Sequence, residues 1–332
     1  MKRVLLLTTG GTIASRPTGE GLAPQMAPDD LLRYMEDLPR HYDIDVLDLM
    51  SLDSSNIQAE EWQKIARAVA SRLPEYDGVV ITHGTDTMAY TASALCYMLR
   101  NLKKPVVLTG AQMPIDNLLT DARNNLYTAF AAVECGIPGV SVAFNHKIIR
   151  GCRAVKVRTM GFEAFESVNA GLLGEVCGDG MHRYCPDAPE EPEFALDDHL
   201  STDVFLLKLI PSTNPAVFSM LEQLGCRGLV IEAFGSGGMH FVRRNLLDAL
   251  TKLTRRGMAV VVCSQCLYET SDLSLYEVGT KLLSCGVIPG RDMTTEAVVT
   301  KLMWALGQTD DPAAIRDMFA TNYAGEITLP ED

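Results

Sequence analysis

The sequence predicts an α/β fold made of two α/β domains with mainly parallel sheets, a larger N-terminal domain and a smaller C-terminal one. Short runs of aliphatic and β-branched residues alternate along the chain with segments of helical periodicity, which is typical of parallel sheets. The length of 332 residues allows roughly two domains of about 150 residues each. Hydrophobic residues make up 47% of the chain and charged residues 21%, a balance that excludes an intrinsically disordered protein.

Seven apolar runs are predicted to be strands, because each is short, β-branched and followed by a turn or a helical pattern. They lie at residues 4–7, 78–82, 105–108, 140–144, 204–209, 228–234 and 258–263. Three helices are predicted from apolar stripes that recur every three or four positions, at residues 62–73, 88–99 and 122–133. Gly136 is expected to end the third of these helices.

The domain boundary is predicted where prolines and acids replace the apolar periodicity, between Cys185 and His199. We therefore expect an N-terminal domain over residues 1–185, a linker over 186–202 and a C-terminal domain over 203–332.

Charge and composition narrow the class of partner. The chain carries 29 Lys and Arg against 42 Asp and Glu, a formal net charge of −13, so nucleic acid is an unexpected partner and a small neutral or zwitterionic ligand remains allowed. No apolar stretch approaches the roughly 18 residues of a membrane span. Nine cysteines without a regular spacing indicate a reducing compartment, and we predict a cytoplasmic protein.

Metal chemistry finds no support in the spacing of potential ligands. Cys263 and Cys266 form a lone C-x-x-C that ends an apolar run, so packed free thiols are the favoured interpretation over redox or zinc chemistry. The histidines show no metal-ligand spacing, and a structural role is favoured for His83. We expect neither a metal nor an organic cofactor.

Hydroxyl chemistry is the remaining possibility at the strand ends, where open parallel sheets bind ligands. Phosphate-binding glycine motifs, the serine-hydrolase elbow and the H-E-x-x-H zinc motif are all absent from the sequence. Thr12 follows the first predicted strand, and Thr85 with Asp86 follows the second. A threonine hydroxyl needs a base to become a nucleophile, and either Asp86 or a desolvated lysine meets that need.

The motifs that carry these threonines resemble those of the bacterial L-asparaginases, specifically the intracellular type I branch. The first runs from Thr9 to Ala14 (TGGTIA) and the second from His83 to Ala92 (HGTDTMAYTA). The segments VLTGAQMP at residues 107–114 and KLMWALG at residues 301–307, together with Gln265–Cys266, agree with that branch, so the resemblance extends over nearly the whole chain.

The resemblance implies an amidohydrolase that converts L-asparagine and water to L-aspartate and ammonia. In the family pattern Thr12 is the nucleophile that forms an acyl-enzyme. The order in which Thr12 and Thr85 act is taken from the resemblance and does not follow from the residues themselves. Thr85, Asp86 and Lys156 match the second catalytic triad. Asp53, Ser54 and Ser55 match the segment that holds the α-amino and α-carboxylate groups of the substrate, with Thr85 and Asp86 beside them.

The family pattern also implies an assembly. A homodimer or homotetramer is expected. Residues 15–24 follow the nucleophile, are rich in Gly and Pro, and are expected to form a mobile lid, in which Leu22 stands where the secreted branch has a catalytic tyrosine. Backbone N–H groups of Gly11, Gly84 or Thr85 are the candidates to stabilise an oxyanion.

Two alternatives stay open. A glutaminase or an ammonia-supplying amidotransferase subunit would share the fold and the threonines, because one methylene separates the two amides. A non-catalytic amino-acid sensor would keep the pocket but lose one or more of Thr12, Thr85, Asp86 and Lys156, all of which are present.

Overall fold

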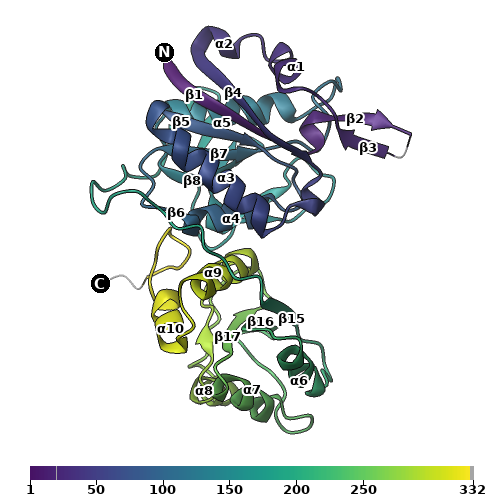
Figure 1. Ribbon diagram of the computed structural model, residues 1–332, viewed down its shortest axis with the longest axis vertical. Helices are drawn as coiled ribbons and strands as arrows, with labels where there is room; N and C mark the ends of the chain where they lie inside the picture. The colour runs from purple at the N-terminus through teal and green to yellow at the C-terminus, as the bar shows by residue number, and fades with distance from the viewer. Residues whose placement is uncertain (20, 330–332) are drawn as a thin grey trace. The chain divides into compact units, whose positions relative to one another are not determined.

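The computed structural model describes residues 1–19 and 21–329 and divides the chain into two compact units, Met1–Asp198 and His199–Asp332 (Figure 1). Each unit is an α/β structure, and the N-terminal unit is the larger. The predicted fold class is therefore confirmed. The division lies inside the segment predicted as a linker, residues 186–202. Part of that segment belongs to a strand pair instead of an irregular linker, because β14 (Ala195–Leu196) pairs antiparallel with β6 (Leu99–Arg100) of the N-terminal unit.

The N-terminal unit is built on an eight-stranded sheet with the order β13-β12-β9-β8-β7-β5-β1-β4. The five strands from β8 to β4 are parallel, whereas β9, β12 and β13 continue the sheet antiparallel. The strands are β1 (Lys2–Gly10), β4 (Tyr42–Leu52), β5 (Gly78–Thr82), β7 (Pro105–Thr109), β8 (Gly139–Phe144), β9 (Lys147–Arg150), β12 (Gly174–Cys177) and β13 (Gly180–Arg183).

Strand β4 was not predicted from the sequence, and the reason is physical. It lies at the edge of the sheet, and its eleven residues alternate aspartates with aliphatic side chains instead of forming a continuous apolar run. A half-exposed edge strand needs apolar residues on one face only, so it lacks the signal that marks the buried strands.

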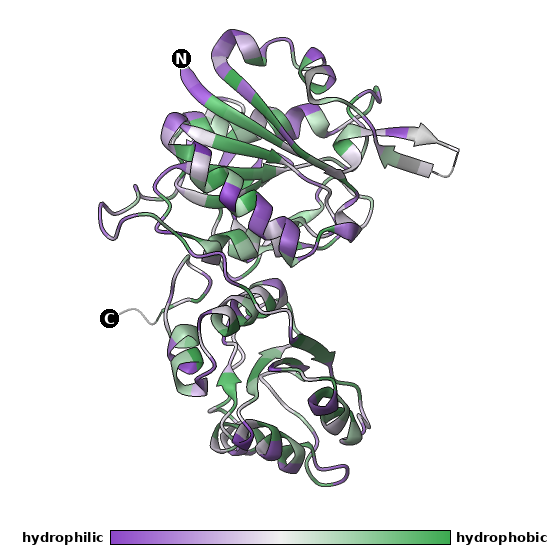
Figure 2. Ribbon diagram, in the orientation of Figure 1, coloured by the Kyte–Doolittle hydropathy of each residue, from purple (hydrophilic) through white to green (hydrophobic). Residues whose placement is uncertain are grey.

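The core of this unit follows from the two-residue period of the strands. Leu6, Val80 and Val107 point to the same face of the sheet and pack with Leu126 and Phe130 of α5 (Ala122–Glu134) in one buried cluster. The central strands are correspondingly hydrophobic along their length, as Figure 2 shows. The other helices are α1 (Pro28–Arg33), α2 (Leu38–His41), α3 (Ala59–Arg72) and α4 (Met88–Met98), with short 3-10 helices η1 (Thr12–Ala14), η2 (Ser54–Asn56), η3 (Leu73–Glu75) and η4 (Gly151–Arg153).

Two small antiparallel pairs lie outside the main sheet. Strands β2 (Ser15–Thr18) and β3 (Gly21–Pro24) form a hairpin directly after η1. Strands β10 (Ala154–Lys156) and β11 (Phe165–Ser167) form the second pair, which places Lys156 opposite Phe165.

The C-terminal unit has a four-stranded parallel sheet with the order β15-β16-β17-β18. Leu250 and Leu253 of α7, together with Phe218 of α6, pack against Ile231 and Val260 of the sheet. The elements are β15 (Val204–Lys208), α6 (Ala216–Gln223), β16 (Gly228–Ala233), α7 (Leu246–Arg255), β17 (Ala259–Ser264), α8 (Glu277–Ser284), β18 (Ile288–Pro289), α9 (Thr295–Gln308) and α10 (Pro312–Ala320). Among the helices of the described residues, none is long and apolar enough to cross a bilayer.

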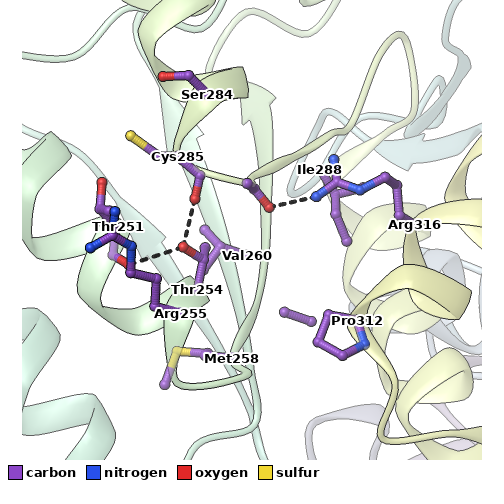
Figure 3. A pocket seen from close by; sticks show the side chains of 12 residues that line it. Thr251, Thr254, Arg255, Met258, Val260, Ser284, Cys285, Ile288, Pro312 and Arg316 are labelled. Atoms are coloured by element: carbon purple, nitrogen blue, oxygen red, sulfur yellow. Dashed lines mark hydrogen bonds between the residues drawn. The ribbon is translucent and has the colours of Figure 1, made fainter.

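A cavity of about 270 Å³ lies where α7, α8 and α10 of this unit meet the first residues of β17 and β18 (Figure 3). Arg316 of α10 donates to the carbonyl oxygens of Gly286 and Val287, at 2.8 and 3.0 Å. Thr254 of α7 donates to the carbonyl oxygen of Cys285 at 2.5 Å. These bonds satisfy carbonyl groups just beyond the C-terminal end of α8, so the polar lining of the cavity serves to cap that helix.

Candidate active site

The candidate site lies at the carboxyl ends of three neighbouring strands of the N-terminal sheet. In the sheet β1 lies between β4 and β5, with Thr8 paired to Thr82 and Gly10 to Leu52. Thr12, Asp53 and Thr85 each follow one of these strands by a few residues. Because parallel strands end at the same edge, the sheet order brings together three segments that are far apart in the sequence.

Glycines allow the loops after β1 and β5 to touch through their backbones. Gly11 has a φ of +81°, and a Cβ atom at this position would lie 2.4 Å from the backbone nitrogen of Gly84. A Cβ atom on Gly84 would lie 2.6 Å from the side chain of Ser54. No side chain fits at such separations, so the contact between the Thr12 loop, the Thr85 loop and the Asp53 segment depends on both glycines.

Thr12 opens the 3-10 helix η1, where the buried side chain of Ile13 fixes the turn against the core. Thr12 itself is half-buried. Within residues 1–19 and 21–329 its hydroxyl group has no hydrogen-bond partner. The structure thus presents an uncommitted hydroxyl at the end of β1.

Lys156 joins Thr85 and Asp86 in one polar cluster. Its Nζ atom donates to the hydroxyl oxygen of Thr85 at 2.8 Å and to a carboxylate oxygen of Asp86 at 2.5 Å. The side chain of Lys156 is 15% exposed and that of Asp86 is 64% exposed, so the lysine lies beneath the carboxylate, which faces solvent. Thr85 is buried. The three residues that the family pattern groups together are therefore in direct contact.

Gln112 is a member of this cluster to which the sequence analysis gave no role. It follows β7, the next strand after β5 in the sheet, and its Oε1 atom accepts a hydrogen bond from the Thr85 hydroxyl at 3.2 Å. The sequence offers one indication of a role in the site, namely that Gln112 lies three residues after Thr109, the end of β7. A glutamine at such a position is compatible with many structural roles. Only the sheet order shows that it reaches Thr85.

His83 belongs to a buried hydrogen-bond chain behind the Thr85 loop. The carbonyl oxygen of Gly84 accepts from Nδ1 at 2.7 Å, so Nε2 accepts from the hydroxyl of Thr91 at 2.9 Å, and Thr91 in turn accepts from the indole of Trp62 at 3.0 Å. The imidazole is fully buried, and burial lowers the pKa of His83 to about 4. A neutral imidazole that holds the Gly84 backbone agrees with the structural role favoured from the sequence.

The segment predicted to hold the substrate's backbone groups forms η2. Asp53 caps this 3-10 helix, since its carboxylate accepts from the backbone N–H of Ser55 at 2.8 Å, and Thr87 donates to the carbonyl of Ser54 at 2.8 Å. Asp53 and Ser55 are exposed, whereas Ser54 is buried against Gly84. Of the three, Asp53 and Ser55 are open to a ligand.

The oxyanion candidates differ in their availability. The N–H of Gly11 donates to the carbonyl oxygen of Leu52 at 3.0 Å, so it is not free for a ligand. In the described part of the chain, the N–H groups of Gly84 and Thr85 have no acceptor. The expectation for Gly11 is therefore wrong, because the register of β1 against β4 commits its donor.

The segment predicted as a lid, residues 15–24, forms the β2–β3 hairpin beside η1. Glu20 lies outside the described residues. The side chain of Leu22, the position of the missing tyrosine, lies outside them as well. Mobility of the hairpin stays a prediction.

Metal-binding groups do not gather in the described residues, where no three His, Cys, Asp or Glu side chains are placed to hold an ion. All nine cysteines are free thiols. Cys263 of the C-x-x-C pair is buried, and burial raises the pKa of its thiol to about 12, which makes it a poor nucleophile.

Two family models together match most of the chain. Residues 3–187 match the N-terminal domain of asparaginase, and residues 203–319 match the glutaminase/asparaginase C-terminal domain. The chain belongs to the asparaginase family. This membership confirms the prediction of an enzyme of the asparaginase type.

Three relatives and one solved structure show what the chain is similar to within this family. The L-asparaginase of Thermococcus kodakarensis is 44% identical over 98% of this chain and 99% of its own length. A solved structure of the thermostable L-asparaginase of that organism has a TM-score of 0.93, with 43% identity over 99% of this chain and 100% of its own. A glutamyl-tRNA(Gln) amidotransferase subunit of the same organism is 38% identical over 98% of this chain and 76% of its own length. L-asparaginase 1 of Escherichia coli is 34% identical over 100% of this chain and 99% of its own.

Asparaginase relatives therefore include archaeal and bacterial proteins. The narrower assignment to the bacterial intracellular type I branch stays a prediction.

Proposed function

We propose that this asparaginase-family protein hydrolyses the side-chain amide of L-asparagine to L-aspartate and ammonia, through an ester on the hydroxyl of Thr12. The contact of Lys156 with both Thr85 and Asp86, beside the loop that carries the free Thr12 hydroxyl, supports this proposal. At this edge of the sheet Thr12 supplies a nucleophile, Lys156 a proton acceptor and Asp86 a carboxylate.

In the first half of the reaction, the Thr12 oxygen forms a bond to the amide carbon and gives up its proton. The amide nitrogen gains a proton as its bond to carbon breaks, and ammonia leaves. The oxygen of the amide carries negative charge in between, and the free N–H groups of Gly84 and Thr85 are the donors available to stabilise it. The loss of one such donor typically costs about 3 kcal/mol in the transition state.

In the second half, water attacks the ester carbon, and the bond to the Thr12 oxygen breaks as that oxygen regains a proton. Thr85 and Lys156 form the proton path for these transfers, with Lys156 as the acceptor in its neutral form. Substrate binding favours that form, because the α-ammonium group of asparagine beside Asp86 places a second cation near Lys156 and competes for the carboxylate. Exposure of Asp86 leaves it accessible to such an ammonium group.

Ammonia release from L-asparagine tests the proposal, with wild type, Thr12→Ala, Thr12→Ser and Thr85→Ala measured side by side. We expect Thr12→Ala to be inactive and to bind L-aspartate, and Thr12→Ser to retain turnover because it keeps the hydroxyl. Mass spectrometry of rapidly quenched wild type should detect an aspartyl adduct on the peptide that carries Thr12. An active Thr12→Ala variant, or an adduct on another residue, contradicts the assignment.

An ammonia-supplying role is a second candidate, because the amidotransferase relative is 38% identical over nearly the whole chain. The net charge of −13 argues against binding of a nucleic acid such as tRNA, because a negatively charged surface repels phosphates. The ratio of kcat/KM for asparagine to that for glutamine distinguishes a dedicated asparaginase from a glutaminase. Tight binding of asparagine without turnover in wild type favours the remaining alternative, a non-catalytic amino-acid sensor.

Assembly and compartment complete the proposal. We propose a homodimer or homotetramer, supported by large apolar side chains exposed on loops of the N-terminal unit, among them Leu118, Leu119 and Met160. Nine free thiols support a cytoplasmic protein of the type I branch. Light scattering with chromatography tests the assembly, and a fully active monomer contradicts it.

A further inference from the structure

We infer that Gln112 is a positioning residue that sets the direction of the Thr85 hydroxyl proton and thereby the protonation balance of Lys156. This inference rests on the proposed function, in which Thr85 and Lys156 transfer protons. It adds a residue that neither the motifs nor the family comparison assigned.

The orientation of the Gln112 side-chain amide is fixed by three partners. Its Nε2 atom donates to the carbonyl oxygens of Thr159 and Gly161, at 3.2 and 3.1 Å. Carbonyl oxygens only accept hydrogen bonds, so the nitrogen must face them and the oxygen must face Thr85. The amide therefore presents an acceptor, and not a donor, to the Thr85 hydroxyl.

The main chain of Gln112 is held equally firmly. The carboxylate of Asp121 accepts from the backbone N–H of Gln112, at 3.0 Å to each oxygen, and from that of Met113 at 3.1 Å. Asn125 of α5 donates to the same carboxylate at 3.0 Å. With both ends fixed, the Oε1 atom of Gln112 is a stationary acceptor for Thr85.

The Oε1 atom of Gln112 determines which bond the Thr85 hydroxyl donates and which it accepts. The Thr85 hydroxyl has one proton, which it donates to Oε1 of Gln112 at 3.2 Å, so a lone pair of its oxygen faces Lys156. A lone pair there accepts an N–H of Lys156, whereas the acceptor lone pair of a neutral Lys156 finds no proton on Thr85, so this arrangement suits the protonated lysine better. Gln112 thus stabilises the charged form of Lys156 and holds the Thr85 oxygen 2.8 Å from its Nζ.

One charge, that of Asp86, also favours the protonated form of Lys156, and neither Gln112 variant removes it. Asp86 is the charged side chain that contacts Lys156 in the described residues. Arg158, which follows β10, and Glu166 of β11 pair with each other at 3.1 Å. Gln112 acts on Lys156 through Thr85 and without a charge of its own.

Two substitutions at Gln112 should shift the titration of Lys156 in opposite directions. In Gln112→Met the acceptor is lost, so the protonated form of Lys156 loses support and its titration midpoint should fall by about half a pH unit, the equivalent of one ordinary hydrogen bond. In Gln112→Glu a carboxylate faces the cluster, which favours the protonated form, so the midpoint should rise. A residue that only maintains the fold would not produce shifts of opposite sign.

The experiment follows Lys156 by NMR, using the ¹³Cε resonance of labelled lysine, assigned with Lys156→Arg, in wild type, Gln112→Met and Gln112→Glu. Gln63→Met and Gln63→Glu are matched controls, because Gln63 of α3 donates to the carbonyl of Asp198 and contacts none of the site residues. In the same proteins the pH dependence of kcat for ammonia release should show its acidic limb displaced the same way. We also expect about a tenfold fall in kcat for Gln112→Met, with KM changed less than about threefold.

Shifts of opposite sign at Gln112 and none at Gln63 support the inference. Unchanged midpoints, or shifts of the same sign in both Gln112 variants, overturn it even if wild type releases ammonia normally. Absence of ammonia release in wild type overturns the proposed function instead, and the NMR titration still decides the role of Gln112. Thermal unfolding monitored by circular dichroism identifies any variant that fails to fold, and Gln112→Leu then replaces Gln112→Met.

Discussion

The Nζ atom of Lys156 lies 2.8 Å from the hydroxyl oxygen of Thr85, although 71 positions separate the two residues in the sequence. Thr85 follows a central strand of the main sheet, while Lys156 ends β10 in a small separate pair of strands. Their contact turns a threonine after a strand, which by itself is most often a turn or cap residue, into part of a candidate proton path.

Removal of the Lys156 amine should lower kcat by about 10²–10⁴-fold, the usual effect of losing a general base, and leave aspartate binding largely intact. Lys156→Ala and Lys156→Met are the test variants, with ammonia release as the measurement. Lys64→Met is the matched control, because Lys64 is an exposed partner of Glu61 on α3. Added methylamine should restore part of the activity of Lys156→Ala but not of Lys156→Met, whose side chain fills the space. Wild-type rates in Lys156→Met contradict the proposed path.

Gly11→Ala should disrupt the contact between the two threonine loops. The new methyl group would lie 2.4 Å from the backbone nitrogen of Gly84, and a φ of +81° is itself unfavourable for alanine. We expect a loss of kcat/KM of more than about 100-fold, because a displacement of about 1 Å at a site costs that much. Gly178→Ala, where the added methyl group meets no atom within 4 Å, is the control and should behave as wild type. Equal activity of the two variants would show that the close approach is dispensable.

His83 should make the protein less stable in mild acid. Its pKa is lowered by burial to about 4 in the folded protein, against about 6.5 when unfolded, so between these values the unfolded state binds more protons. The free energy of unfolding therefore falls as the pH falls from about 6.5 to 4, by about 3 kcal/mol for this one group.

The measurement is urea denaturation from pH 7 to pH 4 for wild type and His83→Gln, whose amide is able to donate to Gly84 and accept from Thr91 without titrating. Because other groups titrate equally in both proteins, the difference between the two curves isolates His83. A difference that stays constant with pH contradicts the prediction.

The Lys301–Glu326 ion pair should be essential for the stability of the C-terminal unit. Both side chains are completely buried, the Nζ and Oε1 atoms are 2.5 Å apart, and Lys301 also donates to the carbonyl of Thr321 at 2.8 Å. Lys301→Met leaves the Glu326 carboxylate buried without its cation and should cost about 3–5 kcal/mol in the free energy of unfolding.

The double variant Lys301→Met with Glu326→Gln should recover part of that loss. The glutamine is neutral and keeps an oxygen at the position of Oε2, which accepts from the backbone N–H groups of both Tyr323 and Ala324. Urea denaturation of the two single variants and the double variant gives the comparison. A double variant less stable than Lys301→Met, or a single loss below about 1 kcal/mol, would show that the pair is not what holds this segment.

Local patterns in the sequence anticipated the core elements. The stripe from Trp62 to Leu73 indicated the helix that the structure shows as α3, and the run at residues 78–82 coincides with β5. Strand β4 was not predicted because it lies at an edge, where Asp43, Asp48 and Ser51 take the exposed positions and no continuous apolar run forms. The roles of Thr12, Thr85, Asp86, Lys156, Asp53, Ser54 and Ser55 came from the family resemblance and stay predictions for the experiments above.

The fold class and the residue types at the strand ends could be read from the chain directly, since helical and strand periodicity are properties of short segments that can be recognised one at a time. Which of those residues meet depends on the three-dimensional arrangement. The order β4-β1-β5-β7 brings the Thr12 loop against the Thr85 loop and Gln112 to the Thr85 hydroxyl, and the β1–β4 register commits the Gly11 N–H to Leu52. Such contacts depend on how the whole sheet is paired, and no local pattern records them.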